Sequence, residues 1–268
     1  MQYSPLPIAQ TSGIRVRVSG VRRSFEGGVV ALDGIDLDVA PGEFLAILGP
    51  SGCGKSTLLR LIAGLDSPQA GEVQTFAREN VQVAWAAGRR ADLAYVFQDA
   101  HLLPWRSVLQ NVALPLELMH QGRGQRLDAS RRAIELVGLT EAVDRFPAQL
   151  SGGQRMRVSL ARAMVTNPRL LLLDEPFAAL DEITRQHLDE QLRRLWAAMG
   201  MTIIFVTHST TEAAYLAQRA VVMTRRPGRI IADHRIALAD ERPAALRGSA
   251  EFAQETRVLY SALERGGA

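Results

Sequence analysis

The feature that most limits what this chain can fold into is its single lysine. Lys55 is the only lysine among 31 lysine and arginine residues. It lies in the run Gly49-Pro50-Ser51-Gly52-Cys53-Gly54-Lys55-Ser56-Thr57, which fits Gly-x4-Gly-Lys-Ser, the P-loop pattern. A compact ammonium on a flexible stem reaches between phosphate groups where a planar guanidinium fits poorly. The glycines let backbone N–H groups turn onto phosphate oxygens, and a following helix points its positive end at them. We therefore predict a nucleotide phosphate site, with Ser56 as a ligand of Mg²⁺.

The residues around this loop have the pattern of an α/β core. Residues 43–48 read as a buried strand before the loop, and residues 56–65 as a helix after it. A short apolar run at 93–97 predicts another strand. Further apolar runs predict parallel strands covered on both faces; they lie at residues 170–173, 202–206 and 220–223.

Other segments predict additions to this core. Residues 14–18 and 35–39 alternate apolar and charged side chains, as half-exposed antiparallel strands do. Residues 107–149 read as mostly helical. Their first apolar stripe should be kinked or broken at Pro115, because proline lacks the N–H of the helical hydrogen bond. The second stripe begins at Ala133 and ends near Gly138.

Two stretches complete the predicted fold. Residues 76–90 carry few signals and are expected to form a surface excursion, whereas Phe252, Leu259 and Leu263 are expected on one face of a closing helix. The predicted fold class is α/β: a P-loop NTPase core with a mostly parallel sheet, an N-terminal antiparallel β subdomain and an inserted α-helical subdomain.

Composition narrows the class of protein. A net charge of +3 does not indicate a surface for polyanions, so we expect no nucleic-acid partner. No apolar run reaches the ~18 residues of a membrane helix, and residues 1–13 lack the pattern of a secretory signal. One cysteine, Cys53, excludes an internal disulfide and suits a reducing cytoplasm.

Two acidic residues follow one of the predicted buried strands. Residues 170–173 are leucines, and Asp174 and Glu175 come directly after them. A carboxylate at this point can hold Mg²⁺, directly or through water, opposite the P-loop serine. Its neighbour Glu175 can polarise a water molecule for attack on the γ-phosphate. A strand capped by two solvated acids is the alternative.

A second anion-binding helix start is predicted at residues 150–154, which read Leu-Ser-Gly-Gly-Gln. A serine and two glycines that open a helix leave N–H groups free, and the helix dipole favours an anion. A simple N-cap, which Ser151 also supplies, is the alternative. This motif, after a P-loop and just before a strand ending in Asp-Glu, resembles the ATP-binding cassette family. The resemblance covers roughly residues 14–235.

The resemblance implies roles for further residues. Gln98 corresponds to the glutamine that contacts Mg²⁺ and the attacking water, and His208 to the histidine that senses the γ-phosphate. Asp181 corresponds to the aspartate that contacts the opposite subunit, although it could be an ordinary helix N-cap. Phe25 takes the place of the aromatic ring that stacks on adenine, although tyrosine is commoner there and Phe25 could belong to the core.

The resemblance also implies an assembly. Two chains are expected to pack head to tail, so that each ATP is held by Lys55 of one chain and by the signature residues of the other, Ser151, Gly152, Gly153 and Gln154. The cofactors are then ATP and Mg²⁺. The implied ATPase domain covers residues 14–235, with the helical subdomain at about 99–165 and a C-terminal helical extension over 236–268.

Three stretches are similar to importers of the nitrate, sulfonate and taurine group: residues 98–105, 174–182 and 226–230. The implied partners are integral membrane permease subunits and, indirectly, a periplasmic solute-binding protein. The chain is then expected at the cytoplasmic face of the membrane as a peripheral subunit. Trp105 either belongs to the groove that receives the membrane subunit or fills the helical lobe. An export- or lipid-type system and a soluble non-transport ATPase are the alternatives.

Overall fold

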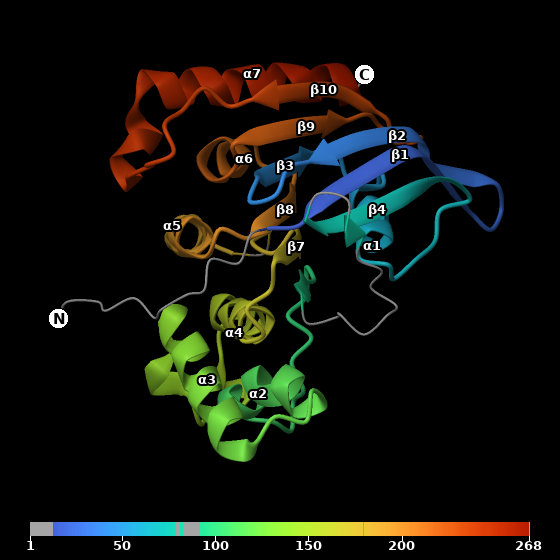
Figure 1. The fold of residues 1–268 in the computed structure, drawn as a ribbon. Coiled ribbons are helices and arrows are strands. Elements are labelled where there is room, and N and C mark those ends of the chain that lie inside the picture. The colour runs from blue at the N-terminus through green and yellow to red at the C-terminus, as the bar shows by residue number, and fades with distance from the viewer. Residues whose placement is uncertain (1–12, 79–80, 83–91, 179, 268) are drawn as a thin grey trace.

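The computed structural model describes residues 13–78, 81–82, 92–178 and 180–267. Within these ranges no helix combines the length and the apolar character that a membrane crossing requires. The described strands form two sheets, and helices cover the larger one (Figure 1).

The smaller sheet is the predicted antiparallel subdomain. Its strand order is β2-β1-β4-β5, and β1 (Arg15–Phe25) pairs antiparallel with both β2 (Val29–Val39) and β4 (Ala70–Arg78). We did not predict β4 or the short β5 (Val81–Gln82), so the expected surface excursion is wrong at residues 76–78 and 81–82. The remaining residues of that segment, 79–80 and 83–90, lie outside the described ranges. The pairing of β4 with β1 is a long-range contact, which local sequence patterns do not encode.

The larger sheet has the order β10-β9-β3-β8-β7-β6. The ladders between β9, β3, β8, β7 and β6 are all parallel, as predicted from the continuous apolar runs. At the edge, β10 pairs antiparallel with β9 and was not predicted, because its side chains alternate over only six residues. The bounds are β3 (Phe44–Leu48), β6 (Leu93–Val96), β7 (Leu170–Asp174), β8 (Thr202–Thr207), β9 (Arg219–Met223) and β10 (Ile230–Arg235).

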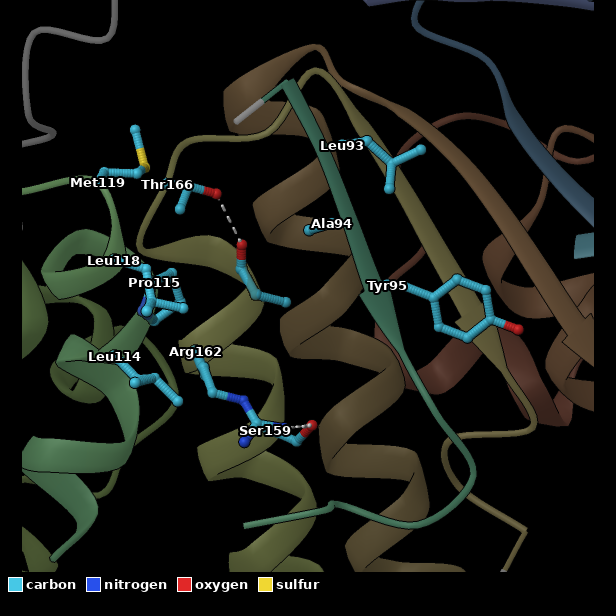
Figure 2. Close-up of a pocket in the computed structure, with 11 residues that line it drawn as sticks. Leu93, Ala94, Tyr95, Leu114, Pro115, Leu118, Met119, Ser159, Arg162 and Thr166 are labelled. Atoms are coloured by element: carbon cyan, nitrogen blue, oxygen red, sulfur yellow. Dashed lines mark hydrogen bonds between the residues drawn. The ribbon is translucent and has the colours of Figure 1, made fainter. Parts of the chain in front are cut away.

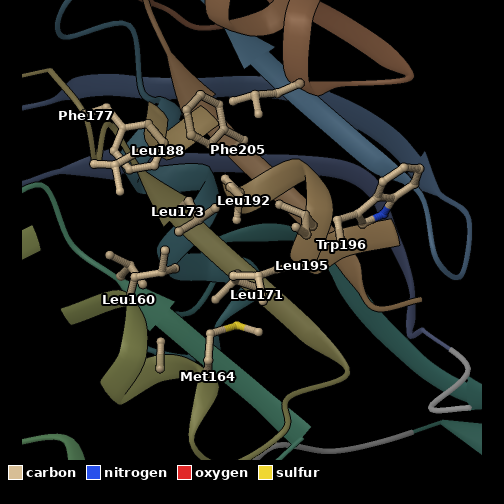
Figure 3. Close-up of a cluster of buried hydrophobic side chains, with 14 of the residues drawn as sticks. Leu160, Met164, Leu171, Leu173, Phe177, Leu188, Leu192, Leu195, Trp196 and Phe205 are labelled. Atoms are coloured by element: carbon tan, nitrogen blue, oxygen red, sulfur yellow. The ribbon is translucent and has the colours of Figure 1, made fainter. Parts of the chain in front are cut away.

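The two faces of this sheet bury different partners. Successive side chains of a strand point to opposite faces, so Leu45 and Ile47 of β3 pack with α1 (Lys55–Ile62) and the smaller sheet, whereas Ala46 and Leu48 face the other way. That opposite face is covered by α4 (Gly152–Met164), α5 (Glu182–Met199), α6 (Thr210–Leu216) and α7 (Ala250–Gly267). Figure 3 shows its centre, where side chains of α4 and α5 pack on β7 and β8. The P-loop helix and the signature helix therefore lie on opposite faces of one sheet.

The helical insertion extends away from both sheets (Figure 1). It contains α2 (Val108–Leu118) and α3 (Arg123–Leu136), followed by 3-10 turns at Thr140–Ala142 and Pro147–Gln149 that lead into α4. Pro115 does not break α2, which continues to Leu118. The helix ends only one turn later, so a single backbone hydrogen bond is lost, the one that Asn111 would accept.

The C-terminal segment closes the fold. A 3-10 turn at Ala244–Gly248 leads into α7, which runs beside β10 (Figure 1). Phe252 and Leu259 are buried and Leu263 packs against the same cluster, so the predicted apolar face of this helix is confirmed. The bounds of the ATPase domain and of the C-terminal extension stay predictions.

Candidate active site

The carboxyl ends of the parallel strands bring the predicted catalytic residues to one edge of the large sheet. The P-loop follows β3, Asp174 and Glu175 end β7, and His208 follows β8. Because β3, β8 and β7 are neighbours and run in the same direction, these residues lie side by side. Ligands of open parallel sheets bind at this edge.

The P-loop turns tightly into α1. Gly54 caps the helix with φ of 107°, and a Cβ atom there would lie 2.9 Å from the carbonyl oxygen of Ala31, so only glycine fits. Lys55 is buried, and its Nζ donates hydrogen bonds to the carbonyl oxygens of Gly49 at 2.8 Å and of Pro50 at 3.0 Å. The ammonium group is therefore held inside the loop that the glycines form.

Ser56 and Asp174 meet as predicted. Ser56 Oγ donates to Asp174 Oδ1 at 2.8 Å, and Tyr95 Oη donates to Asp174 Oδ2 at 3.0 Å. Burial raises the pKa of Asp174, partly opposed by these two hydrogen bonds. Burial, followed by the charge of Asp174, raises the pKa of Tyr95, which keeps the phenol a donor.

The sequence predicts Tyr95 only as part of a strand and does not predict its contact with Asp174. The signal lies in the register of the sheet. Tyr95 pairs with Leu172, and side chains two residues apart on a strand share a face, so Tyr95 and Asp174 lie on the same side. That register is known only once the strands are paired.

Glu175 joins the P-loop lysine to the histidine. Its Oε1 lies 3.2 Å from Lys55 Nζ, and its Oε2 lies 3.1 Å from His208 Nδ1. The backbone of Glu175 has φ of 45°, a left-handed conformation that is uncommon outside glycine, while its N–H donates to the carbonyl of Val206 on β8 at 3.0 Å. Residues of this kind cluster at functional sites.

The signature residues form a separate group. Ser151 Oγ accepts from the N–H of Gln154 at 3.2 Å, and Gln154 Oε1 accepts from the N–H of Ser151 at 2.9 Å, a capping box at the start of α4. Gly153 is buried, and a Cβ atom there would lie 2.9 Å from Thr184 Cγ2 on α5. The first turns of α4 and α5 therefore pack closely.

Asp181 lies at the same place. It is the exposed N-cap of α5, where its Oδ1 accepts from the N–H of Thr184 at 2.9 Å. Within the described residues, no hydrogen bond or ion pair joins Asp181 or the signature residues to the P-loop. The structure thus groups the predicted residues into two sets, one at the P-loop and one where α4 and α5 begin.

Phe25 and Gln98 lie at the margins of the first set. Phe25 is 46% exposed at the end of β1, so the alternative that it belongs to the core is wrong. The guanidinium carbon of Arg23 lies 5.3 Å from its ring centre, and a hollow of about 650 Å³ adjoins both residues. Gln98 is exposed two residues beyond β6, and in the described part of the chain its side chain makes no hydrogen bond with Ser56 or Asp174.

A second cavity lies between β6, α2 and α4. It measures about 570 Å³ and is lined mainly by apolar side chains. Figure 2 shows Leu114, Pro115 and Leu118 of α2 facing Ser159 and Arg162 of α4, with the ring of Tyr95 turned away toward the other side of β6. Arg162 donates to the carbonyls of Ala100 at 2.7 Å and His101 at 2.9 Å, which ties the segment after Gln98 to α4.

Trp105 is 70% exposed, so the alternative that it fills the helical lobe is wrong.

Comparison with known proteins identifies the family of this chain. The family model described as ABC transporter matches residues 32–178. An aliphatic sulfonates import ATP-binding protein, SsuB of Cupriavidus necator, is 46% identical over 93% of this chain and 78% of that protein. An uncharacterized ABC transporter ATP-binding protein of Methanocaldococcus jannaschii is 43% identical over 94% of this chain and 92% of that protein. The chain therefore belongs to the ABC transporter ATP-binding family.

Solved structures agree with this assignment. The dimeric structure of MJ0796, a bacterial ABC transporter cassette, superposes with a TM-score of 0.73 at 30% identity, covering 84% of this chain and all of that one. A dimeric post-hydrolysis state of the same cassette, bound to ADP and Pi, gives a TM-score of 0.72. The predicted α/β cassette fold is confirmed, and the chain is an ATPase that binds ATP and hydrolyses it to drive transport.

Proposed function

We propose that this chain is the ATPase subunit of an importer for organic sulfonates, with its hydrolytic residues at the carboxyl edge of the large sheet. The observation that carries the site is the position of the Glu175 carboxylate, 3.2 Å from Lys55 Nζ and 3.1 Å from His208 Nδ1. Lys55 and the P-loop N–H groups bind the β- and γ-phosphates of ATP. Glu175 accepts the proton of the attacking water, and His208 orients the γ-phosphate. Phe25 stacks on the adenine ring at the hollow beside Arg23.

The oxygen atoms beside the P-loop fit a magnesium ion. Mg²⁺ is bound in nucleotide sites by one or two protein oxygens together with substrate phosphates and water, not by a cage of side chains. Ser56 Oγ and Asp174 Oδ1, 2.8 Å apart, supply such a pair, and no cluster of three or more His, Cys, Asp or Glu side chains suited to a metal occurs in the described ranges. Gln98 is the further oxygen ligand that we propose. When bound, the ion neutralises charge on the phosphate oxygens.

We assign the signature residues to the partner's nucleotide. The P-loop helix α1 and the signature helix α4 cover opposite faces of the same sheet, so Ser151 and Gly153 are not placed to complete the site of their own chain. Two chains that pack head to tail bring the start of α4, with its free N–H groups, to the partner's P-loop. Asp181 lies beside this surface at the start of α5 and contacts the partner. Dimeric structures of a related cassette support this arrangement.

The cavity of α2 and α4 is the proposed contact with the membrane subunits. Two exposed apolar side chains, Leu118 and Met119, line it. We assign Trp105, which is also exposed, to the same docking surface. A helix of a permease subunit that lies in this cavity would press on the segment that Arg162 holds, directly after Gln98. This segment follows β6 and Gln98, so a displacement of it would be transmitted to the nucleotide site. Attachment of this kind places the chain at the cytoplasmic face of the membrane as a peripheral subunit.

The direction and substrate of transport follow from the relatives. Proteins named for aliphatic sulfonate import, from Cupriavidus and Burkholderia, are 44–46% identical over most of this chain. They favour import of a sulfonate, supplied by a periplasmic binding protein, over an export- or lipid-type system. The proposed division of the chain is an ATPase domain at residues 14–235, with a helical subdomain at about 99–165, and a C-terminal extension at 236–268.

A reconstituted transporter tests this function. The chain would be combined in proteoliposomes with candidate permease subunits and candidate solute-binding proteins, and ATP hydrolysis would be measured with taurine, an alkanesulfonate or nitrate. We expect a several-fold stimulation by a sulfonate and none in the Glu175→Gln protein. Stimulation by nitrate alone, or hydrolysis without dependence on binding protein, would contradict the proposed substrate while leaving the ATPase assignment intact.

A further inference from the structure

The turn between β9 and β10 lies against the P-loop. We call residues 224–229 the β9–β10 turn. It follows the carboxyl end of β9, and β9 is the parallel neighbour of β3, whose carboxyl end leads into the P-loop. The topology therefore sets the two loops side by side, although about 170 residues separate them along the chain. Residues 226–230 also form one of the three stretches that are similar to importers of the nitrate, sulfonate and taurine group, and no residue of this stretch belongs to the nucleotide site described above.

Backbone contact fixes this turn on the middle of the P-loop. A Cβ atom on Gly228 would lie 2.2 Å from the carbonyl oxygen of Cys53, so any side chain there would force the two loops apart. The N–H of Gly228 donates to the carbonyl of Ala31 at 2.9 Å, and its carbonyl accepts from the N–H of Asp33 at 3.1 Å. Arg229 forms an ion pair with Asp33. These contacts hold the turn in one position relative to the phosphate loop.

Arg226 adds a charge to this contact. Its Nη2 donates to the carbonyl oxygen of Gly52 at 3.0 Å. The C=O of Gly52 and the N–H of Cys53 belong to one peptide group, and a cationic donor on the carbonyl strengthens the N–H as a donor. Within the loop this N–H has only a long contact of 3.4 Å with the carbonyl of Pro50. A hydrogen bond from the Cys53 N–H to a phosphate oxygen would therefore be strengthened by Arg226.

The end of α7 holds the other side of the turn. The N–H of Arg225 donates to the carbonyl of Gly266 at 2.9 Å. A Cβ atom on Gly266 would lie 3.0 Å from Met223 O and from Ile231 Cδ1, so the last turn of the helix is in close contact with both strands of the hairpin. The β9–β10 turn therefore lies between the C-terminal helix and the P-loop.

We propose that the β9–β10 turn positions the P-loop for nucleotide phosphates, with Arg226 as the positioning residue and α7 as its support. Arg226 acts through the Gly52–Cys53 peptide. The inference rests on the proposed nucleotide site, and it gives the C-terminal helix a part in ATP binding. Since both ATP and ADP present phosphates to the loop, the effect applies to both nucleotides.

Arg226→Ala in the full chain tests this role. Because Arg226 acts only by strengthening the Cys53 N–H as a donor, its loss predicts a Kd for Mg-ATP and Mg-ADP that is weaker by about threefold. We expect kcat at saturating ATP to stay within about twofold, and the Tm without nucleotide to be unchanged, since the guanidinium is exposed. Arg226→Lys should recover part of the affinity, because an ammonium can also donate to the Gly52 carbonyl. If Arg226→Ala only impaired folding, its Tm would instead be lower, and Arg226→Lys would not recover the affinity for nucleotide.

Two further variants make the result decisive. Arg225→Ala removes the same charge from the adjacent exposed residue, whose guanidinium makes no hydrogen bond in the described part of the chain, and it should leave Kd unchanged. If Arg225→Ala weakened nucleotide binding as much as Arg226→Ala, the effect would come from the loss of one positive charge, and the inference would be overturned. Gly266→Val should weaken nucleotide binding in the same direction as Arg226→Ala, and an unchanged Kd in a folded Gly266→Val protein would overturn the part assigned to α7.

Lys55→Ala separates this inference from the function on which it rests. It should abolish binding of Mg-ATP by calorimetry, because the chain has no other lysine to replace it. If Lys55→Ala loses binding and Arg226→Ala does not, the role of the turn is wrong and the nucleotide site stands. If Lys55→Ala binds normally, the proposed nucleotide site itself fails.

Discussion

At the scale of single residues, Glu175 combines an unusual backbone with the central position in the site. Its φ of 45° belongs to a region that costs a non-glycine residue about 1–3 kcal/mol. The N–H bond to Val206 holds this conformation, and the carboxylate then lies between Lys55 and His208. The strained backbone is thus coupled to the placement of the proposed base.

Glu175→Gln tests the role of this carboxylate. The amide has nearly the same shape, so ATP should bind with near-native affinity, but it cannot take a proton from water. We expect hydrolysis to fall by at least about a hundredfold, the lower end of what a general base contributes. Calorimetry and phosphate release measure the two properties separately. Glu141→Gln, an identical change at an exposed site in the helical insertion, should hydrolyse ATP normally. Near-native turnover by Glu175→Gln would exclude Glu175 as the base.

The sequence predicts individual site residues when the motif itself contains the geometry. Lys55, Ser56, Asp174 and Glu175 follow from a loop and a strand end whose spacing fixes their chemistry, and the structure brings them together. Tyr95 and Arg226 could not be predicted in this way. One depends on the register of β6 with β7, and the other on a contact between loops far apart in the chain.

At the scale of elements, buried charges join α5 and α6 to the C-terminal segment. Asp189 on α5 is 1% exposed and accepts from Arg247 at 2.8 Å, while its Oδ1 has no hydrogen-bond partner among the described residues. The Arg247 guanidinium also lies 3.6 Å from the ring centre of Tyr215. Burial, followed by the charge of Glu212 on α6, raises the pKa of Asp189 to about 7, against the opposing effect of Arg247 and Arg185.

This raised pKa predicts how stability depends on pH. The folded protein keeps a proton on Asp189 that the unfolded chain releases near pH 3.8. The stabilising contribution of the protonated carboxyl to the free energy of unfolding is therefore fully present below that pH. It is lost as the pH rises to about 7, at a slope of up to about 1.4 kcal/mol per pH unit. Asp189→Asn lacks this slope. The free energy of unfolding of the native protein should therefore fall relative to that of Asp189→Asn by about 2 kcal/mol between pH 5 and pH 7.

Urea unfolding of both proteins at several pH values measures this difference. Asp144→Asn, at an exposed position, should follow the native profile. Parallel profiles for the native protein and Asp189→Asn would show that the charge of Arg247 compensates burial fully, and would contradict the raised pKa.

Local patterns predicted elements where they are long or fully buried. The apolar runs of β3, β7, β8 and β9 predict parallel strands because helices and a second sheet cover both faces, and the ladders are parallel. The inner strand β4 and the edge strand β10 are not predicted, because each is defined by its pairing with a distant strand, β1 or β9, and not by a pattern in its own sequence. The predicted break at Pro115 is wrong, because α2 ends one turn later and only one backbone hydrogen bond is lost.

At the scale of the whole molecule, the central claim is that one chain contains two different halves of a nucleotide site. The P-loop half lies with α1 on one face of the large sheet, and the signature half lies at the start of α4 on the other. In the proposed head-to-tail dimer, ATP joins two chains through its γ-phosphate, which ADP lacks. Since a ligand shifts an equilibrium only through differential affinity, we expect hydrolysis to reopen this dimer. In the transporter this opening and closing would move the permease.

The most direct test is light scattering of the Glu175→Gln protein with Mg-ATP and with Mg-ADP, with and without Ser151→Arg. We predict a dimer with Mg-ATP only. Adding Ser151→Arg should abolish the dimer by crowding the γ-phosphate, whereas Ser261→Arg, the same change at an exposed position of α7, should leave it intact. Binding of ATP to the monomer should be nearly unchanged by Ser151→Arg. A dimer that persists with Ser151→Arg, or a monomer that loses ATP affinity through it, would contradict the head-to-tail site.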